Sequence, residues 1–269
     1  MKKLYGLFLI IIVFSGCTTN PVTGRSNMAF IPNSQLFAMS NDQYGEFLNE
    51  NTIVTGTPEA AMLVRVGNRL VQAAQKLLVS MGDPNFLNDY RWEFTLIQDN
   101  AVNAWVMPGG KVVFYTGILP LTQNEDGIAV VMSHEIAHAI LNHGQQRMSA
   151  DLLQQIGGLG VTLATINRSP EAQALVMTAY GVGTTFGGTL PFSRAHEREA
   201  DQYGLLLMAI ADYNLEEAAA FWERMMALGG GGTPEFLSTH PSPPNRARDL
   251  HNYIPEAQAK ATQIGILPR

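Results

Sequence analysis

A short segment in the middle of the chain, residues 130–143 (VVMSHEIAHAILNH), carries side chains spaced for metal chemistry. His134 and His138 are four residues apart, so on a helix they lie on one face and can bind the same metal ion. Glu135 lies beside them, where a carboxylate can take a proton from a water that the metal activates. The surrounding residues are mostly apolar, and a buried polar group is costly unless a partner satisfies it. The segment therefore predicts a buried metal site; a chance match on a surface helix is the alternative for HExxH alone.

The third protein ligand must come from elsewhere, because catalytic zinc usually has three protein ligands and one open position. The pattern HExxHxxGxxH is excluded, since Leu141 and Gly144 stand at its glycine and last histidine positions. His143 lies about half a turn off the metal face at ~100° per residue, and we interpret it as a polar exit from the helix.

Better candidates lie in the segment SRAHEREAD, residues 193–201. Glu197 and Asp201 are four residues apart and share a helix face, so one can bind the metal while the other orients a ligand histidine from behind. Glu199 points away from both. Spacing alone does not rank Glu197 above Asp201, and a solvated charged helix is the alternative.

The elements that must position these side chains follow from periodicity and turn signals. Residues 34–49 and 58–81 are predicted helices. Residues 90–98, 101–107 and 111–115 are predicted strands, the last two joined as a β-hairpin by a Pro-Gly-Gly turn. We therefore expect an α+β fold, mainly α, with a small antiparallel sheet beside the metal-site helix.

Two further features flank that helix. Asn103, Ala104 and Trp105 are expected on an edge strand, to which an extended peptide can add itself by main-chain pairing. The alternative is an ordinary edge that another part of the protein protects. Thr122 is expected to cap the metal-site helix, with Glu125 completing a capping box.

An apolar, glycine-rich stretch at residues 152–189 separates the two halves of the metal site. An Asn-Arg-Ser-Pro sequence at residues 167–170 divides it, which predicts a helical hairpin inserted in the domain. Each half is too short or too interrupted for a transmembrane span. We expect the hairpin to pack on the core or to rest against a membrane surface.

The first residues have the features of an export signal. A short basic start precedes an apolar run from Leu4 to Phe14, and small residues lead to Cys17, the only cysteine of the chain. Residues 1–16 are therefore predicted to be a lipoprotein signal peptide, with Cys17 lipidated and residues 17–33 as a tether. An uncleaved membrane anchor is the alternative.

The length and net charge of the chain limit its domain number and its classes of partner. The chain has 269 residues, 46% of them hydrophobic, so residues 34–269 can form a single domain around one core. The net charge is −6 and no basic run is present, so nucleic acid is not an expected partner.

Four motifs in order along the chain resemble those of metallopeptidase family forty-eight, the HtpX/BepA/Oma-like zinc metalloendopeptidases. They are NAWVMPGGKVVFYTG at 103–117, HExxH at 134–138, SRxxExEADxxG at 193–204, and STHP at 238–241 with a following Asn-Arg. The resemblance extends from about residue 20 to residue 254. The long spanning helices of HtpX and the tetratricopeptide extension of BepA are not among the features that match.

The resemblance implies one zinc ion per chain in a gluzincin-type site. His134, His138 and Glu197 would hold the zinc, Glu135 would be the general base, and Asp201 would stand behind a histidine.

Two residues near the C-terminus are implied to act beside the zinc. Arg246 corresponds to an active-site arginine, and His240 to a histidine that can approach the metal in BepA-like members. The run Gly229–Gly232 can act as a hinge for His240. We expect His240 either to fill the open position as a latch or to help catalysis as an oxyanion donor.

By the same resemblance, the chain is expected to be a zinc-dependent metalloendopeptidase of the bacterial cell envelope that hydrolyses unfolded or misassembled envelope proteins. Aspartate directly after the lipidated cysteine is associated with retention at the inner membrane, and here Thr18 stands at that position. We therefore expect lipid anchoring at the outer membrane, facing the periplasm, with outer-membrane assembly machinery as a possible partner. The alternative is an envelope assembly factor that binds client proteins and has a latent zinc site.

Overall fold

The structure is a computed structural model that describes residues 17–228, 234–240 and 245–265; the expected signal peptide and the glycine run at 229–232 lie outside these ranges. The predicted class, α+β and mainly α, is confirmed. The helices are α2 (Asn33–Glu50), α3 (Pro58–Ser80), η1 (Thr116–Ile118), α4 (Leu119–Thr122), α5 (Glu125–Ile140), α6 (His143–Thr165), α7 (Pro170–Thr184), η2 (Thr185–Thr189), α8 (Leu190–Ile210), α9 (Glu216–Ala227), α10 (Glu235–Thr239) and α11 (Arg246–Gln263). The strands are β1 (Cys17–Thr19), β2 (Ser26–Met28), β3 (Glu93–Ile97), β4 (Ala104–Met107) and β5 (Lys111–Tyr115).

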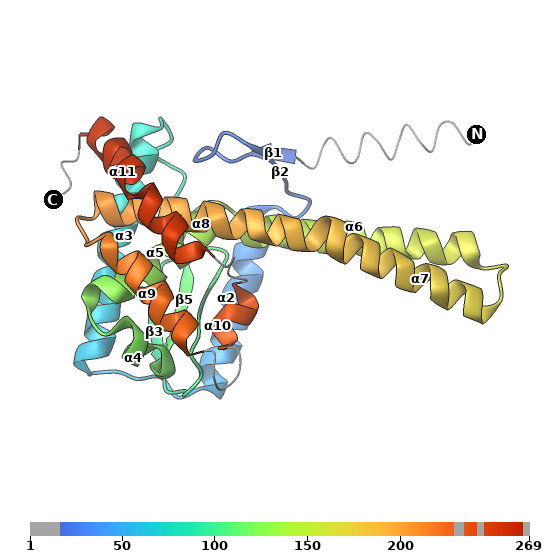
Figure 1. Cartoon of the computed structure of the whole chain (residues 1–269), viewed down its shortest axis with the longest axis horizontal. Helices are drawn as coiled ribbons and strands as arrows, with labels where there is room; N and C mark the ends of the chain where they lie inside the picture. Colours follow the sequence, from blue (N-terminus) through green and yellow to red (C-terminus); the bar gives the residue numbers. More distant parts are fainter. Residues whose placement is uncertain (1–16, 229–233, 241–244, 266–269) are drawn as a thin grey trace.

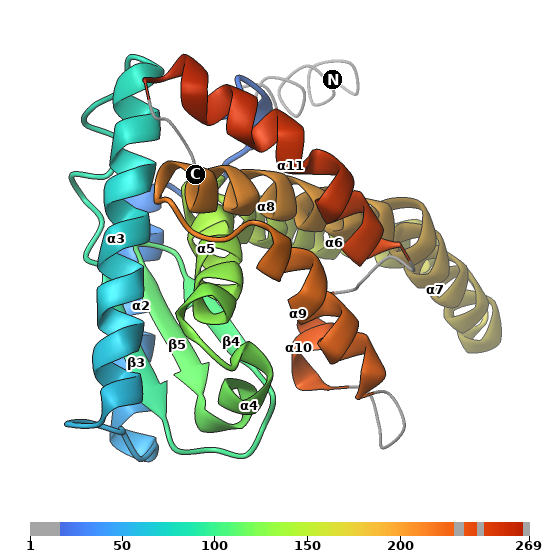
Figure 2. The same cartoon turned by 60° about the vertical axis from the view of Figure 1, so that its left-hand side comes forward.

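Helix α5, which carries the HExxH motif, lies at the centre of the molecule among α3, α8 and α9 (Figures 1 and 2). Every residue from Gly127 to Ile140 is buried, as expected for a helix that is mostly apolar. Asn124 caps the helix, because its side chain accepts a hydrogen bond from the N–H of Gly127 at 3.0 Å. The prediction of Thr122 as the cap is wrong: it ends α4, and its hydroxyl donates to the carbonyl of Leu119.

The three-stranded sheet has the order β3-β5-β4. β4 and β5 form the predicted antiparallel hairpin, with Ala104 opposite Phe114. β3 pairs with β5 in parallel, with Glu93 opposite Lys111, so the prediction of an antiparallel sheet is wrong for β3. The hairpin returns β5, and not β4, to the side of β3. This leaves β4 at the edge of the sheet.

Helix α8 comes very close to α5 at Gly204. A Cβ atom at this position would lie 3.1 Å from the backbone nitrogen of His134. Glycine therefore lets α8 pack directly on the backbone of the HExxH segment. This contact brings the acidic residues of α8 next to the histidines of α5.

The segment that follows Cys17 folds onto the domain. β1 and β2 pair as a short antiparallel hairpin. In the turn between them Asn20 is buried, and its side-chain amide donates to the carbonyl of Ile140 at the end of α5 at 3.0 Å. Tyr203 of α8 donates to the carbonyl of Val22 at 3.0 Å. Residues 17–33, expected to be a tether, therefore reach the metal-site helix.

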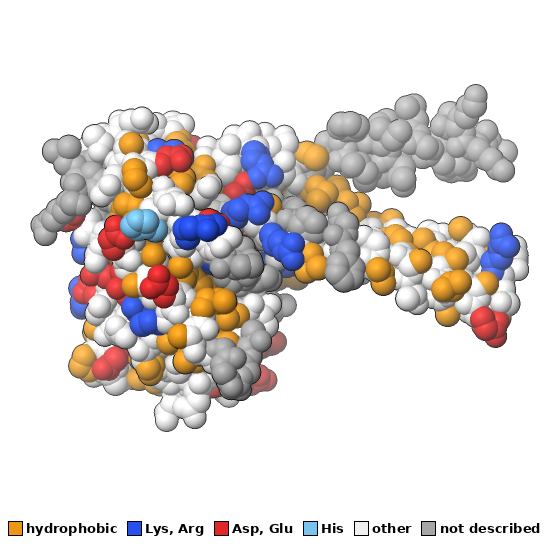
Figure 3. Space-filling model, viewed as in Figure 1, with side chains coloured by type: hydrophobic (Ala, Val, Ile, Leu, Met, Phe, Trp, Pro, Cys, Tyr) orange, Lys and Arg blue, Asp and Glu red, His pale blue; other side chains and the backbone are white. Residues whose placement is uncertain are grey.

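Helices α6 and α7 form an antiparallel hairpin that extends away from the body of the molecule (Figure 1). Large aliphatic side chains are exposed along it, among them Leu159 (65%), Leu163 (68%) and Leu175 (71%) (Figure 3). The hairpin thus projects from the core and does not pack on it, although packing on the core was one of the two expected placements. Within the described residues, no helix has the length and hydropathy needed to cross a bilayer.

Candidate metal centre

Four buried side chains from three parts of the chain meet at one point. His134 and His138 come from α5, Glu197 comes from α8, and His240 follows the last residue of α10. Each offers a ligand atom, and all of these atoms lie within 4.8 Å of one another. The structure therefore brings together the three expected zinc ligands and the histidine expected to approach the metal.

The measured separations of these atoms are those expected of ligands around one zinc ion. His134 Nε2 lies 3.0 Å from His138 Nε2, 3.2 Å from His240 Nδ1 and 3.2 Å from Glu197 Oε2. Glu197 Oε1 lies 3.4 Å from His138 Nε2, and Glu197 Oε2 lies 3.2 Å from His240 Nδ1. Ligands at about 2.0–2.1 Å from zinc would stand about 3.3 Å apart at the corners of a tetrahedron.

The charge of Glu197 also calls for a cation. Burial opposes ionisation of this carboxyl, but the neighbouring histidines outweigh burial and hold its pKa well below its usual range. Its Oε1 is buried without a hydrogen-bond partner. An ionised, incompletely paired carboxylate is costly in a protein interior. Three imidazoles and one carboxylate are a donor set that binds zinc, so these residues fit the metal.

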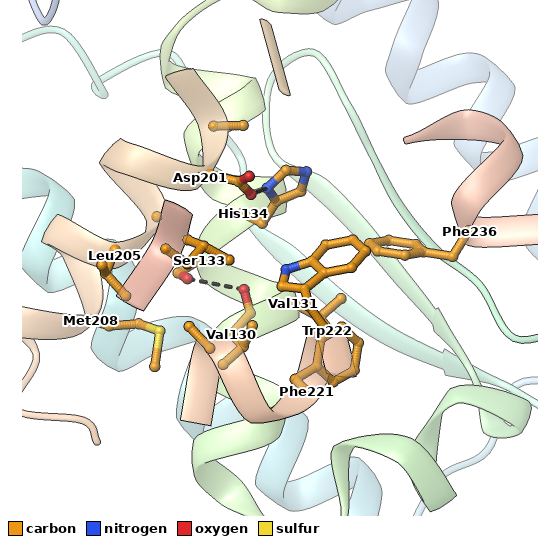
Figure 4. A pocket seen from close by; sticks show the side chains of 14 residues that line it. Val130, Val131, Ser133, His134, Asp201, Leu205, Met208, Phe221, Trp222 and Phe236 are labelled. Atoms are coloured by element: carbon orange, nitrogen blue, oxygen red, sulfur yellow. Dashed lines mark hydrogen bonds and ion pairs between the residues drawn. The ribbon is translucent and has the colours of Figure 1, made fainter. Parts of the chain in front are cut away.

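Asp201 lies behind His134, on the Nδ1 side of its ring. Asp201 Oδ1 is 3.1 Å from His134 Nδ1, and Figure 4 shows the carboxylate pointing at the imidazole. This contact orients His134 so that Nε2 faces the cluster. Burial lowers the pKa of His134, but hydrogen bonds from the ring to Asp201 and Glu197 outweigh burial and raise it to about 9 in the metal-free protein.

Arg246 is buried beside these carboxylates. Its Nη2 donates to Asp201 Oδ1 at 2.6 Å and to Glu197 Oε2 at 3.5 Å. Its guanidinium lies 3.5 Å from the centroid of the Trp222 ring. Burial raises the pKa of Asp201, but the charges and hydrogen bonds of Arg246 and His134 together outweigh burial, and the net shift of the pKa is downward. This placement suits a residue that offsets the charge of the carboxylates.

Glu135 is buried beside His240 and lines the same cavity as His138 and His240. Its Oε1 lies 3.4 Å from His240 Nε2 and has no hydrogen-bond partner. Burial raises the pKa of this carboxyl. The side chain is therefore close enough to the metal position to exchange a proton with a molecule bound there.

His240 reaches the cluster because α10 is docked on the segment before β4. The N–H of Phe236 donates to the carbonyl of Val102 at 3.1 Å, and the amide of Asn103 donates to Glu235 Oε1 at 3.0 Å. Phe236 is fully buried, and its ring stacks on that of Trp222 (Figure 4). These contacts, which periodicity did not reveal, explain how a residue so distant in sequence joins the site.

The edge strand β4 borders a cavity of about 170 Å³ next to the cluster. The residues that line it include Trp105 and Val106 of β4, Glu135 and His138 of α5, and His240. β4 starts at Ala104. Asn103, expected on the strand, precedes it and is buried against α10. A peptide chain lying along β4 would pass the metal position.

His143 is the residue that sequence reasoning misplaced. It is buried, with its Nδ1 2.8 Å from His138 Nδ1 and its Nε2 3.2 Å from Glu199 Oε2. The interpretation as a polar exit is wrong because Asn142 is left-handed (φ 57°) and stands between α5 and α6. A helical angle cannot be extrapolated across this break. The Asn142-His143 pair, at the point where α5 ends, is the sequence signal that could have revealed this position.

Comparison with known proteins finds one family. Its sequence model, described as Peptidase family M48, matches residues 67–254. The chain is 33% identical over 228 residues to the "Mitochondrial metalloendopeptidase OMA1" of Schizosaccharomyces pombe, which covers 82% of this chain and 62% of that protein. It is 27% identical over 261 residues to the "Metalloendopeptidase OMA1, mitochondrial" of Homo sapiens, covering 94% and 49% respectively.

A bacterial relative matches over a shorter region. The chain is 31% identical over 169 residues to the "Beta-barrel assembly-enhancing protease" of Escherichia coli, which covers 60% of this chain and 34% of that protein. The chain thus spans less than two thirds of the length of each of these three relatives.

Proposed function

The chain belongs to peptidase family M48, and from this premise we propose that it is a zinc-dependent endopeptidase of the bacterial cell envelope. Its substrates would be unfolded or misassembled envelope proteins. The observation that carries the proposal is the buried group of ligand atoms from His134, His138, Glu197 and His240, with Glu135 beside His240.

The proposed reaction is hydrolysis of a peptide bond by water. Zinc, when bound, supplies Lewis acidity, which makes a water nucleophilic near neutral pH and polarises the carbonyl. Glu135 takes the proton of the attacking water and returns it to the nitrogen of the leaving amine.

Substrate would bind in an extended form along β4. The strand has no partner on its outer side within the described sheet, so its main-chain groups can pair with a peptide. Because this pairing uses the peptide backbone, recognition would depend little on side chains. Folded proteins rarely offer a free extended segment, whereas unfolded proteins do.

His240 gives the site a closed, resting form. Its Nδ1 lies 3.2 Å from His134 Nε2 and 3.2 Å from Glu197 Oε2, where a fourth ligand would stand, and its Nε2 faces Glu135. A fourth protein ligand occupies the position that the attacking water needs. We infer that His240 must leave this ligand position before catalysis. Arg246 would then act mainly by holding Asp201 and Glu197, as its contacts support.

The same closed form supports a second candidate function. A chain with four protein ligands on its zinc could serve as an assembly factor that binds client proteins along β4 without cutting them. It differs from the protease in the outcome of one test, cleavage by a form that lacks His240.

The proposed location is the outer membrane, with lipid attached to Cys17 and the domain in the periplasm. This rests on the export-type sequence before Cys17 and on the exposure of Cys17 at the start of β1. Contact with outer-membrane assembly machinery belongs to the same proposal.

Casein digestion by the purified protein lacking residues 1–17 tests the function. We expect cleavage that stops with a zinc chelator and returns when zinc is added back. If neither the zinc-loaded protein nor its His240→Ala variant cuts casein, while both bind an unfolded client, the assembly-factor function replaces the protease.

A further inference from the structure

We propose that His143 and Glu199 are positioning residues for the zinc ligand His138. Together they form a hydrogen-bonded chain that leads from the metal centre to the N-terminal hairpin. The inference deepens the proposed function and rests on the zinc site, but it does not depend on protease activity.

The chain of contacts is continuous. His143 Nδ1 lies 2.8 Å from His138 Nδ1, and His143 Nε2 lies 3.2 Å from Glu199 Oε2. Glu199 Oε1 accepts a hydrogen bond from Arg25, which follows the turn of the N-terminal hairpin. His138, His143 and Glu199 come from α5, α6 and α8, so the chain joins three helices.

The direction of each hydrogen bond follows from the metal. His138 presents Nε2 to the cluster, so its neutral ring carries hydrogen on Nδ1 and donates it to Nδ1 of His143. His143 then carries its own hydrogen on Nε2 and donates it to the Glu199 carboxylate. Every nitrogen and oxygen in the chain has one consistent role, and the opposite direction would leave His138 without a lone pair for zinc.

The ring of His143 is also held in place by packing. It is 1% exposed and stacks on the ring of His196, with centroids 4.0 Å apart and planes 10° from parallel. The Nε2 of His196 is in turn 3.0 Å from Gln146 Oε1. His143 therefore presents its lone pair to His138 in a fixed orientation.

Each histidine ligand of α5 thus has a separate support. Asp201 orients His134 directly, whereas a carboxylate acts on His138 through an intervening imidazole. Loss of an outer partner of a ligand histidine typically weakens metal binding by about 10–100-fold. We expect an effect of this size when His143 loses its ring nitrogens.

The test measures zinc affinity by competition with a chelator, in the full mature chain. His143→Phe keeps a ring that can stack on His196 but removes both nitrogens. His143→Gln keeps an acceptor for His138 and a donor for Glu199. Glu199→Gln removes the charge at the far end. The control is His251→Phe, which breaks an exposed histidine–glutamate pair with Glu216, away from the site.

We expect His143→Phe to bind zinc about 10–100-fold more weakly, His143→Gln to recover most of that loss, and Glu199→Gln to weaken binding by a smaller factor. His251→Phe should match the wild type. In the cobalt-substituted protein, the visible absorption bands should shift in His143→Phe and return toward wild type in His143→Gln.

Wild-type zinc affinity in His143→Phe would overturn the proposal, and so would equal losses in His143→Phe and His143→Gln, because packing alone would then explain them. If metal-free His143→Phe does not fold, Glu199→Gln decides, and wild-type affinity there would count against the chain. A protein that binds zinc as described but cleaves nothing would refute the protease function and leave this inference intact.

Discussion

At the scale of single residues, the site holds buried polar atoms that lack partners within the protein. Oε1 of Glu135 and Oε1 of Glu197 have no hydrogen bond, and each buried unsatisfied group costs about 1–3 kcal/mol. The contacts of His134 with Asp201 and of His138 with His143 aim two imidazoles at the same point. A bound cation would satisfy these oxygen atoms. We therefore expect the metal-bound site to be more stable than the metal-free site.

Glu197 should therefore be essential for metal binding. Glu197→Ala removes the anionic ligand and should leave the purified protein nearly free of zinc, whereas Asp201→Asn should weaken binding by about 10–100-fold. Metal analysis after dialysis measures both. Glu223→Ala, at an exposed position of α9, is the control and should keep its zinc. Full zinc content in Glu197→Ala would show that another residue is the third ligand.

At the scale of elements, three helices must meet for the site to exist. Gly204 sets the approach of α8 to α5, and the docking of α10 on the segment before β4 brings in His240. Helix α5 can carry a buried HExxH motif because the neighbouring elements cover every face of the helix. Each of these contacts makes its own prediction.

The contact at Gly204 should tolerate no side chain. In Gly204→Ala the new Cβ would press on the backbone of His134, and the two buried helices could relieve this only by moving apart. We expect a loss of about 1–3 kcal/mol in the free energy of unfolding, together with weaker zinc binding. The matched control is Gly160→Ala in exposed α6, where a Cβ meets nothing within 4 Å; it should stabilise by about 0.5–1 kcal/mol. Chemical denaturation measures both, and unchanged stability in Gly204→Ala would contradict the close-packing argument.

The position of His240 predicts the sign of its effect on activity. As the fourth ligand it should restrain the enzyme, so His240→Ala should digest casein faster than the wild type at equal zinc content. A loss of on the order of 10²–10³-fold would instead mean that His240 is an oxyanion donor. Initial rates of fluorescent casein cleavage distinguish the two, and equal rates would remove His240 from the mechanism.

The sequence was sufficient for those parts of the site that local pattern determines. The spacing of His134 and His138 put both on one face of a helix, and the apolar residues around them indicated burial. Pairing and docking between distant segments could not be read in this way: the parallel partner of β3 and the docking of α10 both depend on tertiary contacts. The prediction for His143 was wrong for a local reason. The left-handed backbone of Asn142 interrupts the helix, so the helical angle of α5 cannot be extended to His143.

At the scale of the whole molecule, the N-terminal hairpin and the base of the α6–α7 hairpin lie together, because β2 packs against α6 (Figure 1). The α6–α7 hairpin exposes aliphatic side chains on a long, mostly uncharged surface (Figure 3). A lipid attached to Cys17 would therefore hold the base of this hairpin near a membrane.

Cys17 should carry that lipid. We expect Cys17→Ser to move from the membrane fraction to the soluble fraction, or to remain with an uncleaved N-terminus, because the attachment atom is missing. Cell fractionation and mass spectrometry of the N-terminal peptide measure this. An intact N-terminus with unmodified Cys17 in the wild type would contradict lipid anchoring.

The most direct measurement combines zinc content with casein cleavage in Glu135→Gln. Glu135 lies beside the ligand atoms without being one of the four that form the cluster, so the variant should keep about one zinc per chain, as a catalytic site requires. It should lose nearly all cleavage, because the amide cannot take a proton from water. A Glu135→Gln protein that keeps its zinc and cuts casein at the wild-type rate would contradict the proposed peptidase site.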